Sequence, residues 1–434
     1  MHVPTLAPPP PIIEGMPPRT VHRTAEIFAV LRDREVRAIW ISEWISDAGS
    51  FVTFIALAVY IHSLTPGVAA VGFALGLRSI AGFLFGPFTG VLADRLDRRR
   101  VMIVCDLARA ALVAALPFTH VVWEAYALAF ASAILSPLFR ASRAALLPQV
   151  APGPKLVPAL TVAETTHHVL HTVGPALGGL VVLLVGARNG FFVDAASFVV
   201  SAGFLSTVRR RGRPSAERRS ALREFGDGLV ALVRTPAVRT YSLINAAVAF
   251  SGAGLVALLV VYVRDVLGEP AGDFGLVLAV GGVATVAASL AIAVRDDRHP
   301  RTPWAFVSAL AGGAFVLLLA HPSFLALLLL GVPLGLLDGG IDVPSSAAEA
   351  ELLADRFRGR AAGASQGFGD LLYASGSILF AWLGEPSRLG IEGAMALAGA
   401  TGVSLALAVL ALGGARAIAG SERTRLAALS RVRA

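Results

Sequence analysis

Residues 90–100 read GVLADRLDRRR, and they join two long apolar segments near 68–92 and 100–119. A helix needs about 20 mostly apolar residues to cross a bilayer, and each of these segments is close to that length. Arginines at the end of such a segment hold the connection on the cytoplasmic side of the membrane. The stretch therefore predicts a cytoplasmic loop between two transmembrane helices.

The rest of the chain repeats this pattern. Twelve expected spans lie near 38–62, 68–92, 100–119, 122–146, 158–185, 189–208, 238–263, 273–294, 303–320, 323–346, 361–384 and 391–415. Basic residues gather in every second connection: Arg19 to Arg37, Arg95 to Arg100, Arg140 to Lys155, Arg209 to Arg239, Arg295 to Arg301, Arg356 to Arg360 and Arg416 to Arg433. The other connections hold only Arg188, Arg264 and Arg388. The positive-inside rule then predicts that both termini are cytoplasmic.

The composition also favours lipid as the surrounding solvent. Of the 434 residues, 56% are hydrophobic and 15% are charged, against about 25% charged in soluble domains. A net charge of +8 would suggest nucleic acid in a soluble protein. Here the basic residues lie between apolar segments, so we expect a lipid bilayer and no nucleic acid as partner. The single cysteine, Cys105, excludes an intrachain disulfide.

We therefore expect an all-α membrane protein with twelve transmembrane helices in two six-helix bundles. Its predicted regions are a cytoplasmic Pro-rich tail 1–37, an N-terminal bundle 38–208, a cytoplasmic basic linker 209–237, a C-terminal bundle 238–415 and a cytoplasmic basic tail 416–434. No apolar signal peptide precedes the first span, which we expect to serve as the signal too.

The linker contains a possible amphipathic helix with Leu222, Phe225, Leu229 and Leu232 on its apolar face. A basic segment of this kind can lie on anionic lipid. A solvated linker is the alternative.

The loop at 90–100 resembles a signature of the major facilitator superfamily: a glycine, Asp-Arg four residues later, and then a basic cluster. Gly90 permits close helix contact, and we expect Asp94 to cap the next helix. The resemblance implies a latch that closes one face of a transporter, with the members Gly90, Asp94, Arg95, Arg98 and Arg99. The family usually has glycine in place of Asp97. The alternative is an ordinary cytoplasmic loop beside a capped helix.

A second motif lies in the fifth span, where residues 171–179 read HTVGPALGG. Proline kinks a helix, and glycines let a neighbouring helix approach. The motif resembles the Gly-Pro motif of the antiporter branch of the same superfamily, with the members Gly174, Pro175, Gly178 and Gly179. Leu170 stands where that motif usually begins with glycine. The resemblance implies export of drugs or metabolites, and a packing kink is the alternative.

Further stretches resemble the macrolide-efflux-like and siderophore-exporter-like members. They are 106–110, 144–148 and 192–198. Arg140 and Arg143 occur without the glycine pattern that accompanies arginine in the fourth span of proton antiporters.

Ionisable residues inside the membrane are costly and therefore mark candidate sites. Glu43 and Asp47 are four residues apart on one helical face, so they could share a proton. The alternative is that Glu43 lies solvated near the inner interface. Arg78 near the middle of the second span needs an anion. We favour Glu43 or Asp47 as its partner over a substrate, because an unpaired buried charge is costly.

The fifth span carries a second ionisable group, in which Glu164, His168 and His171 share one helical face. Histidine titrates near physiological pH, which suits a proton relay or a cationic gate. A metal site formed by His167 and His171 would lack a third ligand, and imidazoles satisfied by the backbone are a further alternative. We therefore expect no metal.

The second half offers Asp338 and Asp342 in the tenth span, either as a carboxylate pair of the cavity or as helix caps. Gln366, Asp370 and Tyr373 in the eleventh span are weaker candidates of the same kind. Asp106 and Arg109 have the spacing of a structural pair within one helix.

The sequence thus predicts a monomeric secondary transporter of the inner (plasma) membrane, without a cofactor, that exports an amphipathic drug or metabolite in exchange for protons by alternating access. An uptake carrier on the same fold is the first alternative. An integral-membrane enzyme or receptor is the second, although the chain has no phosphate-binding loop, zinc-protease motif or serine nucleophile elbow.

Overall fold

The computed structural model describes residues 29–209, 221–270, 273–295, 323–353 and 355–423, and these contain helices and no strands. Six long helices form the first bundle: α2 (Arg34–Leu64), α3 (Val68–Arg95), α4 (Arg98–Ala115), α5 (Val122–Val150), α6 (Leu156–Val185) and α7 (Ala187–Ser206). In this bundle α2 packs along α6 and α7, while α4 packs along α5 and α7. The expectation of an all-α fold is confirmed.

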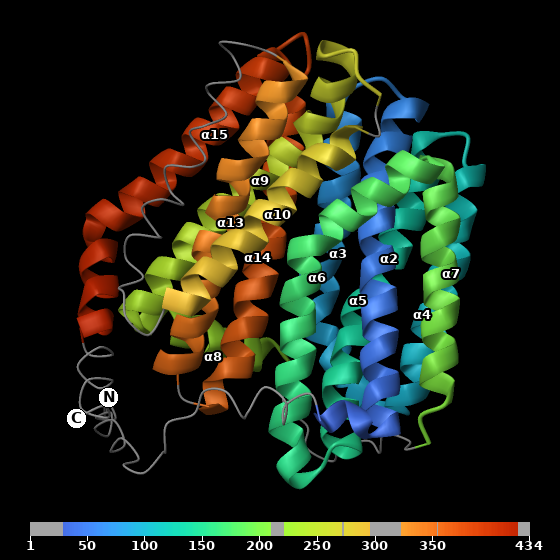
Figure 1. Ribbon diagram of the computed structural model, residues 1–434, viewed down its shortest axis with the longest axis vertical. Coiled ribbons are helices and arrows are strands. Elements are labelled where there is room, and N and C mark those ends of the chain that lie inside the picture. Colours follow the sequence, from blue (N-terminus) through green and yellow to red (C-terminus); the bar gives the residue numbers. More distant parts are fainter. Residues whose placement is uncertain (1–28, 210–220, 271–272, 296–322, 354, 424–434) are drawn as a thin grey trace.

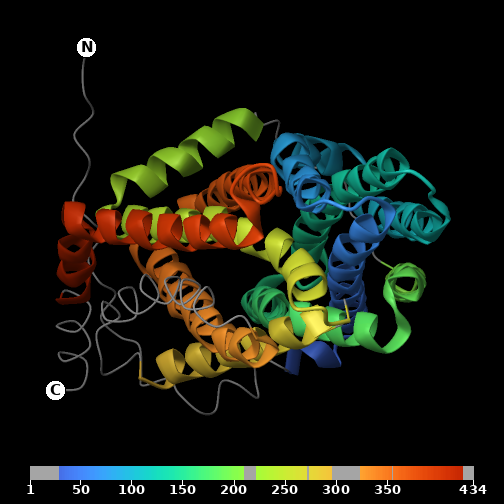
Figure 2. The same cartoon turned by 90° about the horizontal axis from the view of Figure 1, so that it is seen from above.

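The second bundle contains α9 (Pro236–Val261), α10 (Asp273–Arg295), α13 (Phe324–Leu352), α14 (Asp355–Leu383) and α15 (Gly390–Val409). Figure 1 and Figure 2 show it beside the first bundle. The ninth expected span, 303–320, lies outside the described residues. Beyond α15 the chain stays helical to Arg423, past the expected end at 415, through a bend at Gly413.

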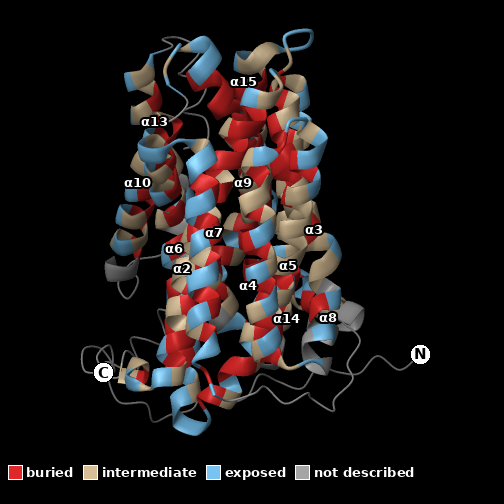
Figure 3. Ribbon diagram, turned by 90° about the vertical axis from the view of Figure 1, so that its right-hand side faces the viewer, coloured by how far each residue is buried: buried red, intermediate tan, exposed pale blue. Residues whose placement is uncertain are grey.

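The outer surface of the bundles is apolar. Among the described residues, nine helices are long and apolar enough to cross a membrane. Leu184, Val283 and Leu412 are at least 70% exposed, and Figure 3 shows the exposed residues on the outward faces of the helices. A soluble protein rarely exposes so many large apolar side chains, so this surface is of the kind that lipid covers.

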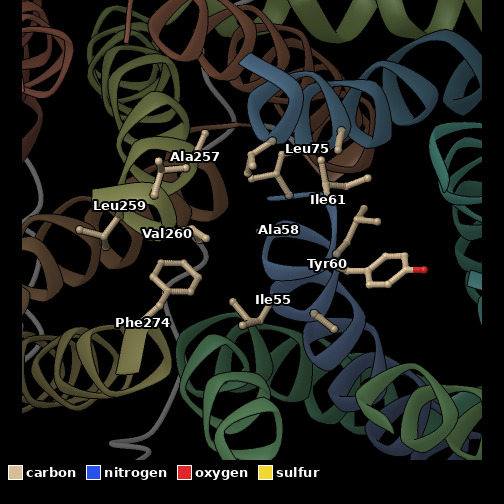
Figure 4. Packing of buried hydrophobic residues seen from close by; sticks show 14 of the residues in the cluster. Ile55, Ala58, Tyr60, Ile61, Leu75, Ala257, Leu259, Val260 and Phe274 are labelled. Carbon is tan, nitrogen blue, oxygen red and sulfur yellow. The ribbon is translucent and has the colours of Figure 1, made fainter. Parts of the chain in front are cut away.

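One apolar core joins both bundles at the end opposite the arginine-rich loops. Figure 4 shows Ile55 and Ile61 of α2 in the same cluster as Val260 of α9 and Phe274 of α10. At the arginine-rich end the core is divided: one cluster belongs to the first bundle and another to the second. The molecule is therefore closed at one end and split at the other.

Glycines allow close contact between the bundles at the closed end. A Cβ on Gly179 of α6 would lie 2.9 Å from the carbonyl carbon of Gly275 in α10. The other crossing pairs α3 with α14, where Ser377 Oγ donates to the Gly72 carbonyl at 2.9 Å. The two crossings hold the bundles together on either side of the shared core.

The first turn of α3 is capped from the other bundle. Gly67, its N-cap residue, offers no side chain, and the Ala69 amide donates instead to Glu385 Oε1 at 2.9 Å. A carboxylate at a helix N-terminus satisfies a free N–H group and meets the positive end of the helix dipole. This bond adds a polar link to the closed end.

The structure corrects the expected N-terminal cap of the helix that follows the loop at 90–100, which is α4. The cap of α4 is Asp97, whose side chain accepts from the Arg100 amide at 3.2 Å, and not Asp94. The reason is that α3 continues through Asp94 to Arg95, so Asp94 belongs to its last turn. Asp97 therefore supplies the cap of α4.

The start of α2 is held in a similar way at the arginine-rich end. Asp33 accepts from the Glu35 amide at 3.1 Å and pairs with Lys155 Nζ at 2.8 Å. The Lys155 ammonium and the helix amides hold the pKa of Asp33 below its usual range. These contacts fix α2 against the beginning of α6.

The expected linker helix is present as α8 (Ala221–Arg234). It packs against α14, with Leu232 buried and Phe225 partly buried. Asp227 pairs with Arg360 Nη1 at 3.2 Å. The helix therefore lies against the second bundle at the arginine-rich end.

Gly178→Ala should destabilise the protein, because its Cβ would lie 2.5 Å from the Phe51 carbonyl oxygen and 3.0 Å from the Val52 nitrogen. Forcing α2 and α6 apart should cost about 1–3 kcal/mol. Gly203→Ala is the matched control, since nothing lies within 4 Å of its Cβ position on α7. Thermal unfolding in detergent checks both, and equal midpoints for the two variants would contradict the prediction.

Candidate functional site

A cavity of about 1630 Å³ lies between the two bundles. Helices α2 to α6 line one side of it, and α9, α10, α13 and α14 line the other, with α8 at the rim. Pockets for small molecules are commonly about 300–1,000 Å³. The cavity therefore has room for an organic molecule together with water.

The cavity opens toward the arginine-rich end. Val157 on the first turn of α6 and Leu229 and Val233 on α8 line it and are exposed. At the other end, Leu75 and Leu259 line the cavity and belong to the core shared by both bundles. The shared core thus closes the cavity on that side.

Besides Arg109 of α4, which pairs with Asp106, three charged residues of the first bundle line the cavity: Asp47 on α2, Arg78 on α3 and Arg140 on α5. None of them has an ion pair within 4.0 Å among the residues that the structure describes. Asp47 lies within electrostatic reach of Arg140 and of Arg109 on α4. Charges at this depth without a close partner are stable only beside water or a ligand.

The second bundle contributes polar residues from α13 and α14. Asp338, Gln366, Asp370 and Tyr373 all line the cavity, including the weaker candidates of the eleventh span. Gln366 Nε2 donates to Asp370 Oδ1 at 3.1 Å. Asp370 Oδ2 lies against Gly82 of α3, where a Cβ would be 2.6 Å from it. The two bundles therefore bring opposite charges to facing walls.

Glu43 does not line this cavity, contrary to expectation. It is buried on α2 and forms an ion pair with Arg143 of α5. The expected pairing of Arg78 with Glu43 or Asp47 is also wrong, because among the described residues Arg78 forms no ion pair within 4.0 Å with either of them. The carboxylate within its electrostatic reach is Asp194 on α7. For Glu43, depth along the helix explains the difference. At 1.5 Å per residue, Glu43 lies roughly 13 Å from the arginine-rich end of α2, whereas Arg78 lies roughly 25 Å from that end of α3. The two charges are at different depths.

Asp106 and Arg109 form the expected ion pair within α4, and both are buried. Ser201 Oγ on α7 donates to Asp106 at 2.6 Å. The Arg109 guanidinium lies over the rings of Phe139 and Phe198, 4.8 and 4.3 Å from their centroids. Because its charge is neutralised by Asp106 and its faces are covered by rings, this pair is structural.

The Gly-Pro motif serves two contacts at once. The α6 helix continues through Pro175, which lines the cavity. Gly174 and Gly178 face Phe51 of α2 within the first bundle, and Gly179 faces α10 in the second. The motif therefore contacts both bundles from one helix.

The loop arginines Arg98 and Arg99 hold carbonyl groups of the first bundle. Arg98 Nη1 donates to the Ala145 carbonyl at 3.0 Å, and Arg99 Nε donates to the Leu205 carbonyl at 3.0 Å. A cation near the last turn of α7 meets the negative end of its dipole. The side chains of Asp94 and Arg95 and the surroundings of Gly90 lie outside the described part of the chain.

The same holds for Glu164, His168 and His171 on α6 and for Asp342 on α13, whose side chains are not described. Their neighbour His167 lines the cavity. Among the described residues, no group of three histidine, cysteine or carboxylate side chains could hold a metal ion.

Sequence reasoning did not place Arg140 in the site. It placed Arg140 and Arg143 at the inner end of the expected span 122–146 and counted them with the cytoplasmic basic residues, whereas α5 continues to Val150 and keeps both further inside the helix. The available signal was the apolar sequence on both sides of the two arginines, which allows the helix to continue. One turn apart on α5, Arg140 faces the cavity and Arg143 faces Glu43.

Comparison with known proteins gives one family. The model of the Major Facilitator Superfamily matches residues 39–292 and 241–428. The MFS-type transporter YfiS of Bacillus subtilis is 27% identical over 252 residues, which are 56% of this chain and 59% of YfiS. The multidrug efflux pump Tap of Mycolicibacterium fortuitum is 30% identical over 170 residues, 36% of this chain and 42% of Tap. The matched part thus spans about half the length of these relatives.

Solved structures share the fold at low identity. The nucleoside transporter NupG superimposes with a TM-score of 0.67 at 14% identity, and the match covers 87% of this chain and 98% of NupG. A bacterial homologue of the lysosomal transporter Spinster gives a TM-score of 0.66 at 14% identity, covering 90% and 97% of the two chains. With the family model matching both halves, the chain belongs to the Major Facilitator Superfamily of membrane transporters.

Proposed function

We propose that this transporter exports an amphipathic small molecule from the cytoplasm by alternating access, driven by protons moving inward. The observation that carries the proposal is the cavity between the bundles, which reaches the arginine-rich end and is closed at the other end by the shared core. In alternating access, such a cavity opens to one side at a time as one bundle rocks against the other.

The positive-inside rule supports the direction in which this cavity opens. Arginine-rich connections of membrane proteins remain in the cytoplasm. The cavity would then collect its substrate from the cytoplasm, and both termini would be cytoplasmic. An exporter loads from this side.

The contacts at the closed end are of a kind that can exchange. They are the His62–Asp265 pair at 3.2 Å, the Glu385 cap on α3 and the Ser377–Gly72 hydrogen bond. Each joins the two bundles through one polar contact, which contributes roughly 0.5–1.5 kcal/mol. The apolar core shared by the two bundles around these contacts contains no covalent link, so a rocking motion of one bundle against the other can open it.

The carboxylates of the cavity supply candidate proton carriers. Asp47 lines the cavity between Arg109 and Arg140 without a close ion pair among the described residues. Such a carboxylate can take up a proton when the cavity faces an acidic side and release it when the arginines approach. Asp370 and Asp338 on the facing wall are further candidates, as are Glu164, His168 and His171 on α6.

Similarity to exporters supports the outward direction. Tap, and PmrA of Streptococcus pneumoniae at 25% identity over 241 residues, are both named as multidrug efflux pumps. PmrA covers 53% of this chain, and the match spans 58% of its own length. The loop at 90–100 would then serve as a latch during turnover, with Asp94 and Arg95 at its centre.

Labelling of introduced cysteines tests the orientation of the cavity. In a Cys105→Ala background, Ser50→Cys on the cavity wall should react with a membrane-impermeant maleimide in inverted vesicles and not in intact cells. Leu405→Cys, which is exposed on α15 toward lipid, should react in neither. Labelling of Ser50→Cys from outside intact cells would contradict the proposed orientation.

Asp47→Asn should uncouple transport from protons. Inverted vesicles with an acidic interior should accumulate norfloxacin, a fluorescent amphipathic quinolone, and the variant should lose at least about 90% of that gradient-driven uptake while exchange without a gradient persists. Asp33→Asn, which keeps a capping side chain outside the membrane, is the matched control. Unchanged gradient dependence in Asp47→Asn would exclude Asp47 as the carrier.

Asp94→Asn should slow turnover while expression and thermal stability stay near wild type. The latch needs the carboxylate charge, whereas the last turn of α3 accepts asparagine at little cost. Initial rates of norfloxacin uptake, normalised to protein in the membrane, give the comparison with Asp97→Asn, which keeps the cap of α4. Wild-type rates in Asp94→Asn would remove the latch role.

A further inference from the structure

The two walls of the cavity carry opposite charge. Among the described lining residues, the first bundle presents Arg78 and Arg140 against one carboxylate, Asp47, while the charge of Arg109 is neutralised by Asp106. The second bundle presents three carboxylates against one arginine, and these are Asp338, Glu349, Asp370 and Arg239. The cavity therefore has a basic wall and an acidic wall that meet across the interface of the bundles.

Charged residues of the two walls, Arg78 on α3 and Asp370 on α14, lie close together. Arg78 and Gly82 are one turn apart on α3, and the Asp370 carboxylate packs against Gly82. Arg78 lies within electrostatic reach of Asp194 on α7 and of Tyr373, which is one turn along α14 from Asp370. Arg140 acts on Asp370 across the cavity as well. Arg78 and Arg140 nonetheless form no ion pair within 4.0 Å among the described residues.

Open space between facing opposite charges favours a ligand that carries both. Arg78 offers a planar set of donors that suits a carboxylate, while Asp370 is hydrogen-bonded by Gln366 on one side and can accept from an ammonium group. Apolar rings of Phe51 and Phe54 on α2 and Phe368 on α14 also line the cavity and fit an apolar body. A singly charged ligand would bind either Arg78 and Arg140 or Asp370, but not both.

We propose that the cavity selects zwitterionic amphipathic molecules, whose anionic group binds Arg78 and Arg140 on the first bundle and whose ammonium group binds Asp370 on the second. This inference rests on the proposed function, because it takes the cavity as the transport site. A ligand held by both bundles at once also draws them together, so binding favours closure of the open end.

One alternative uses the same residues without a ligand. The opposite charges of the two walls would pair with each other when the cavity collapses during turnover. That arrangement predicts that neutralising Arg78 or Asp370 slows transport and leaves ligand preference unchanged. The two explanations therefore differ in a binding measurement.

The test uses four forms of one scaffold. Norfloxacin has a carboxylate and a piperazine ammonium at neutral pH, its ethyl ester is a cation, its N-acetyl derivative is an anion, and the N-acetyl ethyl ester is neutral. Fluorescence titration of the purified transporter in detergent should give at least tenfold tighter binding of the zwitterion than of the other three. Equal binding of any singly charged form, or binding of none of the four, overturns the proposal.

Two variants test which wall binds which charged group of the ligand. In Asp370→Asn the zwitterion and the N-acetyl anion should bind equally, and in Arg78→Gln the zwitterion and the ester cation should bind equally. Ser79→Ala, beside Arg78 on the cavity wall, is the uncharged control and should keep the wild-type ratios. If Arg78→Gln fails to fold, Arg140→Gln replaces it. Wild-type ratios in both charge variants overturn the proposal.

The binding assay separates this inference from the proposed function. The assay uses no gradient. If the zwitterion is not preferred but the cysteine labelling and the gradient-driven uptake are as expected, the zwitterion site formed by Arg78, Arg140 and Asp370 is excluded and the proposed function remains. Conversely, if the zwitterion is preferred but uptake does not depend on the pH gradient, proton coupling is excluded and the zwitterion site remains.

Discussion

The apolar core that both bundles share at the closed end is the constraint on which the rest of the molecule depends. In a bilayer, burying apolar side chains adds little, because lipid tails are as apolar as the core itself. Close packing must therefore hold the bundles together, and it requires glycine at Gly179 and Gly275 and at Gly72. Since the arginine-rich end has two separate cores, the space between the bundles opens there.

Intramembrane charges divide into two groups by their partners. Glu43 pairs with Arg143, and Asp106 pairs with Arg109 between two aromatic rings, so these charges stabilise the first bundle. Arg78, in contrast, faces the cavity without a close ion pair among the described residues. Holding a charge in this way costs stability unless water or a ligand pairs with it, which is why we propose the second group as part of the transport site.

The basic loop and the Gly-Pro motif connect these two features. Arg98 and Arg99 tie the loop to carbonyls of α5 and α7, so the first bundle can move as one body. On α6, Gly178 packs against the same bundle, while Gly179 one residue later packs against α10. A rigid bundle with a glycine contact at its edge can rock against its neighbour with few bonds to break.

The sequence by itself determined the membrane environment, the helical class and the family, because spans of about 20 apolar residues and arginine-marked connections follow from local chemistry. It also identified Asp47, Arg78 and Asp338 as intramembrane charges. Only the tertiary structure decided their partners. Glu43 meets Arg143 rather than Arg78, and Arg140 faces the cavity rather than a loop, because helix depth and rotation depend on packing between segments far apart in the chain.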